Sequence, residues 1–352
     1  MNFQSAGEGS EVELVAQSPP AQYELKMLYL NKLTIEKMEK QHQHNEINRR
    51  GFLKAGAGLA ATAFLLPFGG TKVFGAFNPA NANPSIPTVK LNNGVQMPML
   101  GFGTNTLTGD VGQRCVFDAI SVGYRSIDTA HVYGNEESVG AGIKQSGIDR
   151  KELFVTSKLW VDFAGYEPTK KAFQTSIDKL GTGYLDLYLI HRPRGDVKGS
   201  WLAMEELCKA GKIKAIGVSN FEPHQLDELM QHAKIKPVIN QIETHVFFQE
   251  NNLYDVLKKE SVQHEAWSPF AAGRNEIFSN PVLAAIGKKY NKSIAQVCLR
   301  WHYQRGVVAI PRSQNKAHMI ENLNIFDFKL DKKDLDTIAT LDLNKTQFPE
   351  WT

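Results

Sequence analysis

Residues 154–191 read FVTSKLWVDFAGYEPTKKAFQTSIDKLGTGYLDLYLIH. Two short apolar runs, Phe154–Lys158 and Leu185–His191, flank an amphipathic helical pattern at Thr169–Leu180. A strand, a helix and a second strand in this order form a parallel pair, because the connecting helix returns the chain to the same end of the sheet. This stretch therefore predicts an α/β fold built on a parallel sheet.

The same alternation continues on both sides of this stretch. Strictly alternating strands and helices predict a parallel sheet covered by helices, and eight such units predict closure into a single (β/α)8 TIM barrel. The predicted strands are Leu100–Gly103, Ser126–Asp128, Phe154–Lys158, Leu185–His191, Ala215–Ser219, Val238–Glu243, Glu265–Trp267 and Val307–Pro311. The predicted helices of the repeat are Val111–Val122, Glu137–Gln145, Thr169–Leu180, Trp201–Lys209, Pro223–Gln231, Leu253–Glu260 and Ile294–Arg305.

Three segments fall outside the repeat. Thr88–Leu91 and Val95–Pro98 flank Asn-Asn-Gly and predict a β-hairpin, which we expect to plug the N-terminal end of the barrel. Asn280–Tyr290 and Lys332–Leu341 predict two extra helices. A doubly wound sheet is the competing architecture, but no Gly-x-Gly-x-x-Gly motif opens any strand–helix unit.

The bulk composition excludes several classes of protein. Hydrophobic residues make up 42% of the 352 residues and charged residues 22%, which is typical of a globular chain with a sizeable core. The 40 basic and 37 acidic residues nearly balance, and without a basic block we expect no nucleic-acid partner. Cys115, Cys208 and Cys298 lie far apart, so we expect neither disulfides nor a metal site.

The N-terminal region differs in character from the rest. Arg49 and Arg50 begin a basic segment, and the uncharged stretch 55–68 follows it. That stretch is shorter than the ~20 residues a membrane-spanning helix needs, so we expect no stable membrane span. The paired arginines resemble a bacterial twin-arginine signal, which implies the export machinery as a partner and a periplasmic or exported location. The alternative is a buried helix after a chance Arg-Arg pair, with a cytoplasmic location.

The boundaries of this signal segment are predicted separately. Residues 1–82 form the N-terminal extension and signal segment, with cleavage expected after Ala82, and residues 83–352 form the barrel domain. Twin-arginine leaders are usually short, so Met27 and Met38 are alternative starts, and Met38 gives the more normal leader. Because the pathway transports folded proteins, a tightly held cofactor could travel with the chain.

Polar residues follow the apolar runs at the strand ends, where the chemistry of β/α barrels gathers. Asp128, Lys158 and His191 end three successive predicted strands, and Tyr133 lies in the loop after the first of them. Each residue alone would suggest a helix cap, a surface group or a core histidine. Four at successive strand ends predict one site.

These four residue types suit carbonyl reduction, which needs a hydride on carbon and a proton on oxygen. A tyrosine is a weak acid at neutral pH, and we expect the Lys158 ammonium to lower the pKa of Tyr133. Asp128 would hold Lys158 and keep it charged. A neutral His191 would hydrogen-bond the substrate oxygen.

Two motifs carry a family resemblance that covers about residues 86–343. The segment 123–136, GYRSIDTAHVYGNE, is similar to the aldo-keto reductase signature, and 97–104, MPMLGFGT, resembles the opening strand of that family. The resemblance implies NAD(P)H-dependent reduction of aldehydes or ketones to alcohols. It also implies a catalytic tetrad, which corresponds here to Asp128, Tyr133, Lys158 and His191.

The resemblance also implies where the cofactor binds. Ser219, Asn220 and Gln241 correspond to the residues that hold the nicotinamide carboxamide, and Trp267 to an aromatic ring that stacks on nicotinamide. The usual residue at this last position is Tyr. The remaining predicted cofactor-binding residues are Ser268 and Phe270 for the pyrophosphate, Arg312, Ser313 and His318 for the adenosine phosphate, and Glu321 and Asn322 for the adenine.

The adenosine end departs from the family pattern. Arg312 stands where the family often has Lys, and His318 where it often has Arg. Arg312 can still bind a phosphate through two hydrogen bonds, whereas His318 is cationic only when protonated. We therefore expect NADPH, bound through Arg312, Ser313 and Lys316, with NADH as the alternative.

Short loops predict an open substrate pocket, because the loop after the fourth strand and the C-terminus are both brief. Arg192 stands where the family often has Trp and would attract an anionic substrate; an arginine facing solvent or Asp196 is the alternative. Tyr133 also faces this pocket. The other predicted pocket residues are Phe102, Trp160, Arg192 and Phe221.

Two other functions stay open on the sequence. A non-catalytic NADP(H)-binding sensor, of the kind that potassium-channel β-subunits represent, would bind the dinucleotide without turnover. A cofactor-free β/α barrel lyase or isomerase would not bind nicotinamide at all. An assay of carbonyl reduction and a binding titration discriminate these functions from a reductase.

Overall fold

The computed structural model describes residues 86–351. The twin-arginine motif, the apolar stretch after it and the expected cleavage site at Ala82 lie outside the described residues.

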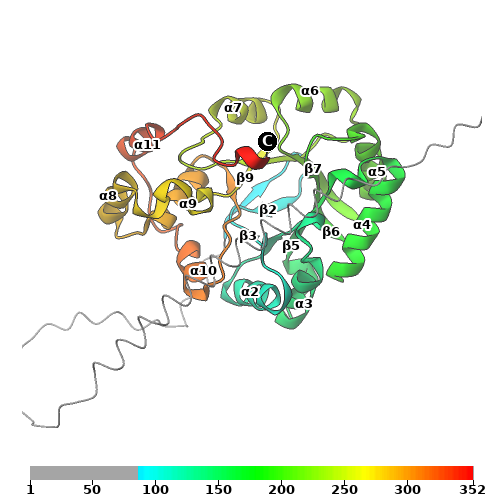
Figure 1. Cartoon of the computed structure of the whole chain (residues 1–352), viewed down its shortest axis with the longest axis horizontal. Helices are drawn as coiled ribbons and strands as arrows, with labels where there is room; N and C mark the ends of the chain where they lie inside the picture. The colour runs from blue at the N-terminus through cyan, green and yellow to red at the C-terminus, as the bar shows by residue number, and fades with distance from the viewer. Residues whose placement is uncertain (1–85, 352) are drawn as a thin grey trace, which may run out of the picture. The chain divides into compact units, whose positions relative to one another are not determined.

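Eight parallel strands form one curled sheet at the centre of this region, and helices surround it (Figure 1). The strands are β3 (Phe102–Gly103), β4 (Ser126–Asp128), β5 (Phe154–Leu159), β6 (Leu185–Ile190), β7 (Ile213–Ser219), β8 (Ile239–Glu243), β9 (Gln263–Trp267) and β10 (Val308–Ala309). Each strand pairs with the next in sequence. The predicted (β/α)8 barrel is confirmed.

The barrel closes between its first and last strands. Leu100 forms a parallel bridge with Ala309, whose carbonyl oxygen accepts a 2.9 Å hydrogen bond from the amide of Gly101. A Cβ on Gly103 would lie 2.7 Å from the carbonyl oxygen of Ile310, so only glycine allows this approach. The closing strands are shorter than predicted because only these few residues keep regular ladder geometry.

In residues 86–351 eight helices cover the strands, where seven were predicted, and the two predicted extra helices lie outside the repeat. The repeat helices are α2 (Gly109–Val122), α3 (Glu136–Ser146), α4 (Tyr166–Leu180), α5 (Val197–Lys209), α6 (Pro223–His232), α7 (Asn251–Lys259), α9 (Ile294–Gln304) and α10 (Lys316–Leu323). The extra helices are α8 (Pro281–Tyr290) and α11 (Lys332–Ala339).

Helix α10 is the repeat helix that the hydrophobic pattern did not predict. It has only eight residues, and just Met319, Asn322 and Leu323 are buried, so its apolar periodicity is weak. A local signal was present nonetheless, because the Asn315 side chain accepts a hydrogen bond from the Ala317 amide and caps the helix.

The predicted hairpin is present and closes the end of the barrel where the strands begin. Strands β1 (Thr88–Lys90) and β2 (Gln96–Pro98) pair antiparallel. In the turn, the Asn92 side chain donates to the carbonyl oxygens of Pro237 and Ser261, at 2.9 and 3.1 Å, just before β8 and β9. Leu91 and Met97 are buried against the first inward-facing residues of the strands.

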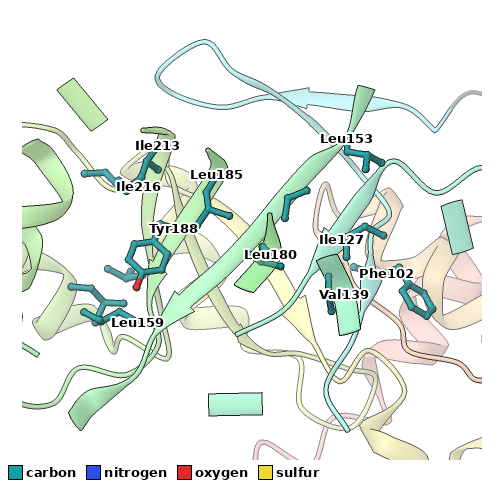
Figure 2. Close-up of a cluster of buried hydrophobic side chains, with 14 of the residues drawn as sticks. Phe102, Ile127, Val139, Leu153, Leu159, Leu180, Leu185, Tyr188, Ile213 and Ile216 are labelled. Carbon is teal, nitrogen blue, oxygen red and sulfur yellow. The ribbon is translucent and has the colours of Figure 1, made fainter. Parts of the chain in front are cut away.

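Strand alternation divides the core into two regions. Leu187 and Leu189 of β6 point into the barrel, in the cluster that contains the hairpin. Tyr188 and Ile190 point outward, in the larger cluster between strands and helices, part of which Figure 2 shows. The polar residues at the C-terminal ends of the strands therefore lie next to a barrel interior filled with apolar side chains.

No helix among residues 86–351 is long and apolar enough to cross a membrane.

Candidate active site

Three predicted catalytic side chains meet at the C-terminal ends of β4 and β5. The Lys158 ammonium lies 2.5 Å from Asp128 Oδ1, 2.9 Å from the carbonyl oxygen of Thr129 and 3.4 Å from the Tyr133 hydroxyl. Lys158 points inward because it shares the parity of Phe154 and Thr156 on a strand whose alternate residues face the barrel interior. The side chains of Lys158 and Asp128 are 0% and 3% exposed.

Lys158 stays charged despite its burial. Burial by itself would lower the pKa of the ammonium, but the neighbouring Asp128 and Tyr133 outweigh it, and the net pKa is raised above its usual value. This agrees with the role expected for Asp128. An unpaired lysine at this depth would tend to lose its proton.

Tyr133 is at the end of a short 3-10 helix, η1 (His131–Tyr133). Its pKa is raised above the ordinary value because desolvation outweighs the opposing effect of Lys158, and Asp128 adds to the rise. Lys158 acts in the expected direction, but the expected net lowering of the Tyr133 pKa is wrong. The phenol therefore keeps its proton at neutral pH.

His191 follows β6 and faces Tyr133. Their ring centroids lie 5.8 Å apart, and the His191 ring also packs edge-on against Trp160 at 5.4 Å. Burial, Lys158 and Arg192 hold the pKa of the imidazole well below its usual range, so it is neutral as expected. Its Nδ1 has no hydrogen-bond partner among the described residues.

The predicted carboxamide-binding residues gather beside this tetrad, at the ends of β7, β8 and β9. Asn220 has a left-handed backbone, with φ 62°, and its side chain donates to the His191 carbonyl oxygen at 3.0 Å. Its Oδ1 accepts a 2.9 Å hydrogen bond from the Trp267 indole. Ser219 is buried and donates to the Gln241 carbonyl oxygen at 2.7 Å. These contacts hold amide and aromatic groups next to the tetrad.

Gln241 connects the tetrad to a residue that the sequence did not single out. Its Nε2 donates to Asp128 Oδ2 and to Glu265 Oε2, both at 2.9 Å. Glu265 is 0% exposed in the middle of β9. The available signal was a carboxylate at the first position of the predicted strand Glu265–Trp267, where a buried charge requires a partner.

The predicted adenosine-binding residues lie around the start of α10. Arg312 and His318 are exposed, and the hydroxyl of Ser313 bonds the backbone of Asn315. Lys316 is paired with Asp118 at 3.1 Å. All three basic groups are therefore exposed, and Lys316 is the one among them that is paired with Asp118.

The two residues predicted to contact the adenine, Glu321 and Asn322, differ in their solvent exposure. Glu321 is partly exposed, whereas Asn322 is only 4% exposed and its side chain hydrogen-bonds the buried Tyr124. Tyr124 also donates to the Met319 carbonyl oxygen at 3.3 Å. Asn322 therefore has a core partner in this structure.

Two predicted pocket walls are wrong. Phe102 and Phe221 are each 1% exposed and belong to the main core cluster. Phe102 shares the outward parity of Leu100 and lies in the layer between strands and helices (Figure 2). Its ring packs edge-on against that of Tyr124. Trp160 and Arg192 are only partly buried, beside Tyr133.

The short C-terminal segment returns to the site. Glu243, at the end of β8, accepts hydrogen bonds from the Thr346 hydroxyl, at 2.5 Å, and the Gln347 amide, at 2.8 Å. Phe348 is 5% exposed and packs edge-on against Trp267, with ring centroids 5.1 Å apart. The sequence predicted an open pocket from the brevity of this segment; even so, the segment supplies one aromatic ring near the predicted nicotinamide position.

A hollow of about 560 Å³ lies at the opposite end of the barrel, beside the hairpin. Its lining includes Thr88, Arg125 and Lys214 and none of the predicted site residues. Its position agrees with the general rule that the N-terminal face of a β/α barrel serves stability, whereas the chemistry lies at the C-terminal face.

A (β/α)8 barrel whose strand ends bring together Asp, Tyr, Lys and a neutral His, beside the residues predicted to hold a carboxamide, has the arrangement expected of a nicotinamide-dependent carbonyl reductase. The model of the aldo/keto reductase family matches residues 99–343. The chain belongs to this family and is an NAD(P)H-dependent oxidoreductase.

Individual relatives agree with this assignment. Glyoxal reductase of Bacillus subtilis is 50% identical over 264 residues, which cover 74% of this chain and 95% of that protein. Methylglyoxal reductase DkgA of Escherichia coli is 40% identical over 272 residues, covering 76% and 98%. An aldo-keto reductase of Bombyx mori solved in complex with NADP is 34% identical, with a TM-score of 0.71, covering 75% and 95%.

A second family model, that of twin-arginine signal sequences, matches residues 46–65. The match includes the paired arginines and the first part of the apolar stretch, on which the signal was predicted. A signal of this type indicates export.

Proposed function

We propose that this protein reduces aldehydes and ketones to alcohols, with Tyr133 as the proton donor. The observation that carries the proposal is the position of the Lys158 ammonium, which is held by Asp128 and lies 3.4 Å from the Tyr133 hydroxyl. A cation at this distance stabilises the phenolate that remains after proton transfer. Asp128 acts through Lys158 by keeping it charged.

His191 orients the substrate in this proposal. A neutral imidazole next to Tyr133 can donate a hydrogen bond to the carbonyl oxygen that also receives the Tyr133 proton. Two donors on one oxygen polarise the carbonyl and direct its carbon away from the ring pair. Trp160 also packs edge-on against His191 and helps to hold the imidazole in this orientation.

The residues at the ends of β7, β8 and β9 fit a nicotinamide group. Ser219, Asn220 and Gln241 offer amide and hydroxyl groups for a carboxamide, and Trp267 offers a ring that Asn220 fixes. When bound, NADPH supplies the hydride. Arg312, Ser313 and His318 would hold its adenosine phosphate, with Ser268, Phe270, Glu321 and Asn322 as the further proposed contacts.

Small aldehydes are the substrate class that the relatives favour, since two of them are named for glyoxal and methylglyoxal. The test is consumption of NADPH, followed by its absorbance, with methylglyoxal and 4-nitrobenzaldehyde. Turnover with either aldehyde supports the proposal. Binding of NADPH without turnover on a broad panel of carbonyl compounds would instead indicate a sensor.

Arg192 adds a preference for anionic substrates in this proposal. It directly follows His191 and is partly buried near Tyr133. Arg192→Ala is expected to raise the KM for a 2-oxo carboxylate about tenfold, the loss of one partly screened charge interaction. The KM for a neutral aldehyde should change less than twofold, and Arg194→Ala, on the exposed side of the same loop, is the matched control. Equal effects on charged and neutral substrates would refute the role.

Export through the twin-arginine pathway is the proposed location signal. Replacing both Arg49 and Arg50 by Lys is expected to abolish export of the folded enzyme, because the arginine pair is the recognised part of such a signal. The measurement is fractionation of a bacterial host followed by the reductase assay. Unchanged activity in the periplasmic fraction would show that the segment is not a working signal.

A further inference from the structure

Glu265 is a buried acid beside the tetrad that the proposed mechanism does not use. It lies in β9, and its side chain points into the barrel interior. There the Gln241 side chain, from the neighbouring strand, hydrogen-bonds both Glu265 and Asp128. The residue is 0% exposed, and its Oε1 has no hydrogen-bond partner among the described residues. A carboxyl group so placed needs an explanation, since burial without a partner is costly.

The bridge through Gln241 makes one connected network. The two N–H groups of its amide are shared between Asp128 and Glu265, and Asp128 in turn holds Lys158 next to Tyr133. Each link is a hydrogen bond between side chains of which only Tyr133 is partly exposed. In a water-poor interior, charge at one end of such a network acts at the other.

Charge balance shows what Glu265 can do there. Among the described residues of this network Lys158 is the one cation, and the ion pair with Asp128 already neutralises it. A second carboxylate on the other side of Gln241 would leave one uncompensated negative charge. We propose that Glu265 is a positioning residue of the catalytic network, which acts through Gln241 and Asp128 and sets the proton affinity of the Lys158–Tyr133 pair.

The titratable groups that face Glu265 are few. Asp128 comes from β4, Lys158 from β5 and Tyr133 from η1, whereas β8 contributes the neutral Gln241 and β10 places Val308 opposite Glu265. Burial and the nearby Asp128 raise the pKa of Glu265 to about 8. At neutral pH Glu265 is therefore mainly protonated, and it gains a negative charge as the pH rises through this value.

The sign of its effect follows from this charge. Ionised Glu265 raises the pKa of both Lys158 and Tyr133, because a negative charge favours the cation and disfavours the phenolate. Tyr133 thus retains its proton to higher pH than it would beside a neutral residue. Glu265 thus extends the pH range over which carbonyl reduction has a protonated donor. This inference rests on the proposed role of Tyr133 as that donor.

The test is the pH profile of kcat/KM for aldehyde reduction in Glu265→Gln. The amide keeps an acceptor for Gln241 but cannot ionise, so the alkaline fall of the profile should move to lower pH by about one unit. Glu265→Met, which fills a similar volume without a polar group, should move it in the same direction and guards against a folding failure of one variant. The matched control is Glu205→Gln, a buried acid outside the network that binds the backbone amides of 234 and 235, and its profile should coincide with the parent profile.

A direct titration separates this inference from the proposed function. Phenolate absorbance of the intact enzyme, with Tyr133→Phe as the blank, reports the ionisation of Tyr133 without turnover and should show the same shift. If Tyr133→Phe is inactive and neither Glu265 variant shifts the profile or the titration, the role of Glu265 is wrong. If Tyr133→Phe remains fully active, the proposed role of Tyr133 as proton donor fails whatever the Glu265 variants do.

Discussion

Replacement of Tyr133 by Phe is expected to lower kcat for aldehyde reduction by about 10²–10⁴-fold, the usual contribution of a positioned general acid. The variant loses only the hydroxyl oxygen that lies 3.4 Å from the Lys158 ammonium. Its ring can still pack against His191, so the affinity for NADPH should change little. The measurements are steady-state kinetics with methylglyoxal and a fluorescence titration with NADPH.

The control for this variant is Tyr184→Phe. Tyr184 directly precedes β6, at the opposite end of the barrel, and its hydroxyl contacts the Arg150 carbonyl oxygen at 3.5 Å. Its loss should leave kcat within about twofold, as expected for a change away from the site. If Tyr133→Phe retained more than a tenth of the parent kcat, another group would have to donate the proton.

The second large effect is expected from Lys158→Met, on both stability and activity. Removing one partner of a buried ion pair strands the other charge, and such changes cost about 3–5 kcal/mol in free energy of unfolding. Asp128 would be the stranded group, since its side chain is 3% exposed. Activity should fall with the loss of the cation beside Tyr133. Urea unfolding followed by tryptophan fluorescence measures the first effect.

The double variant Asp128→Asn, Lys158→Met separates the two effects. With both charges removed, most of the lost stability should return, because no unpaired charge remains in the interior. Activity should not return. Lys332→Met removes an exposed pair with Asp336 and should change stability by less than about 1 kcal/mol. Equal losses in the single and double variants would show that packing, rather than charge, dominates at this position.

The local pattern of the chain was sufficient to predict the barrel. Apolar runs of strand length alternate with amphipathic segments, and this periodicity depends only on which residues neighbour each other in sequence. It also placed Asp128, Lys158 and His191 at strand ends, where a barrel collects its polar groups. Helix α10 was not predicted, because eight residues with three buried positions give too weak a hydrophobic periodicity.

Side-chain direction was harder to predict near the ends of short strands. Phe102 was expected in the pocket, but it lies on the outer face of β3 with Tyr124. An aromatic residue faces the interior or the helices according to its place in the alternation along the strand. Strand β3 has only two residues, so its alternation is set by pairing in the closed barrel and not by a visible sequence pattern. The same argument applies to Phe221, which is buried in the same core cluster.

Residues 154–191 show which features follow from the sequence alone and which depend on the tertiary structure. Its two strands, the helix between them and the placement of Lys158 at a strand end follow from the order of apolar and polar residues. The partners of Lys158, and the bridge from Asp128 through Gln241 to Glu265, join residues far apart in sequence. The sign of the Tyr133 pKa shift also depends on this packing, because desolvation is a property of everything that surrounds a group and not of its neighbours in the chain.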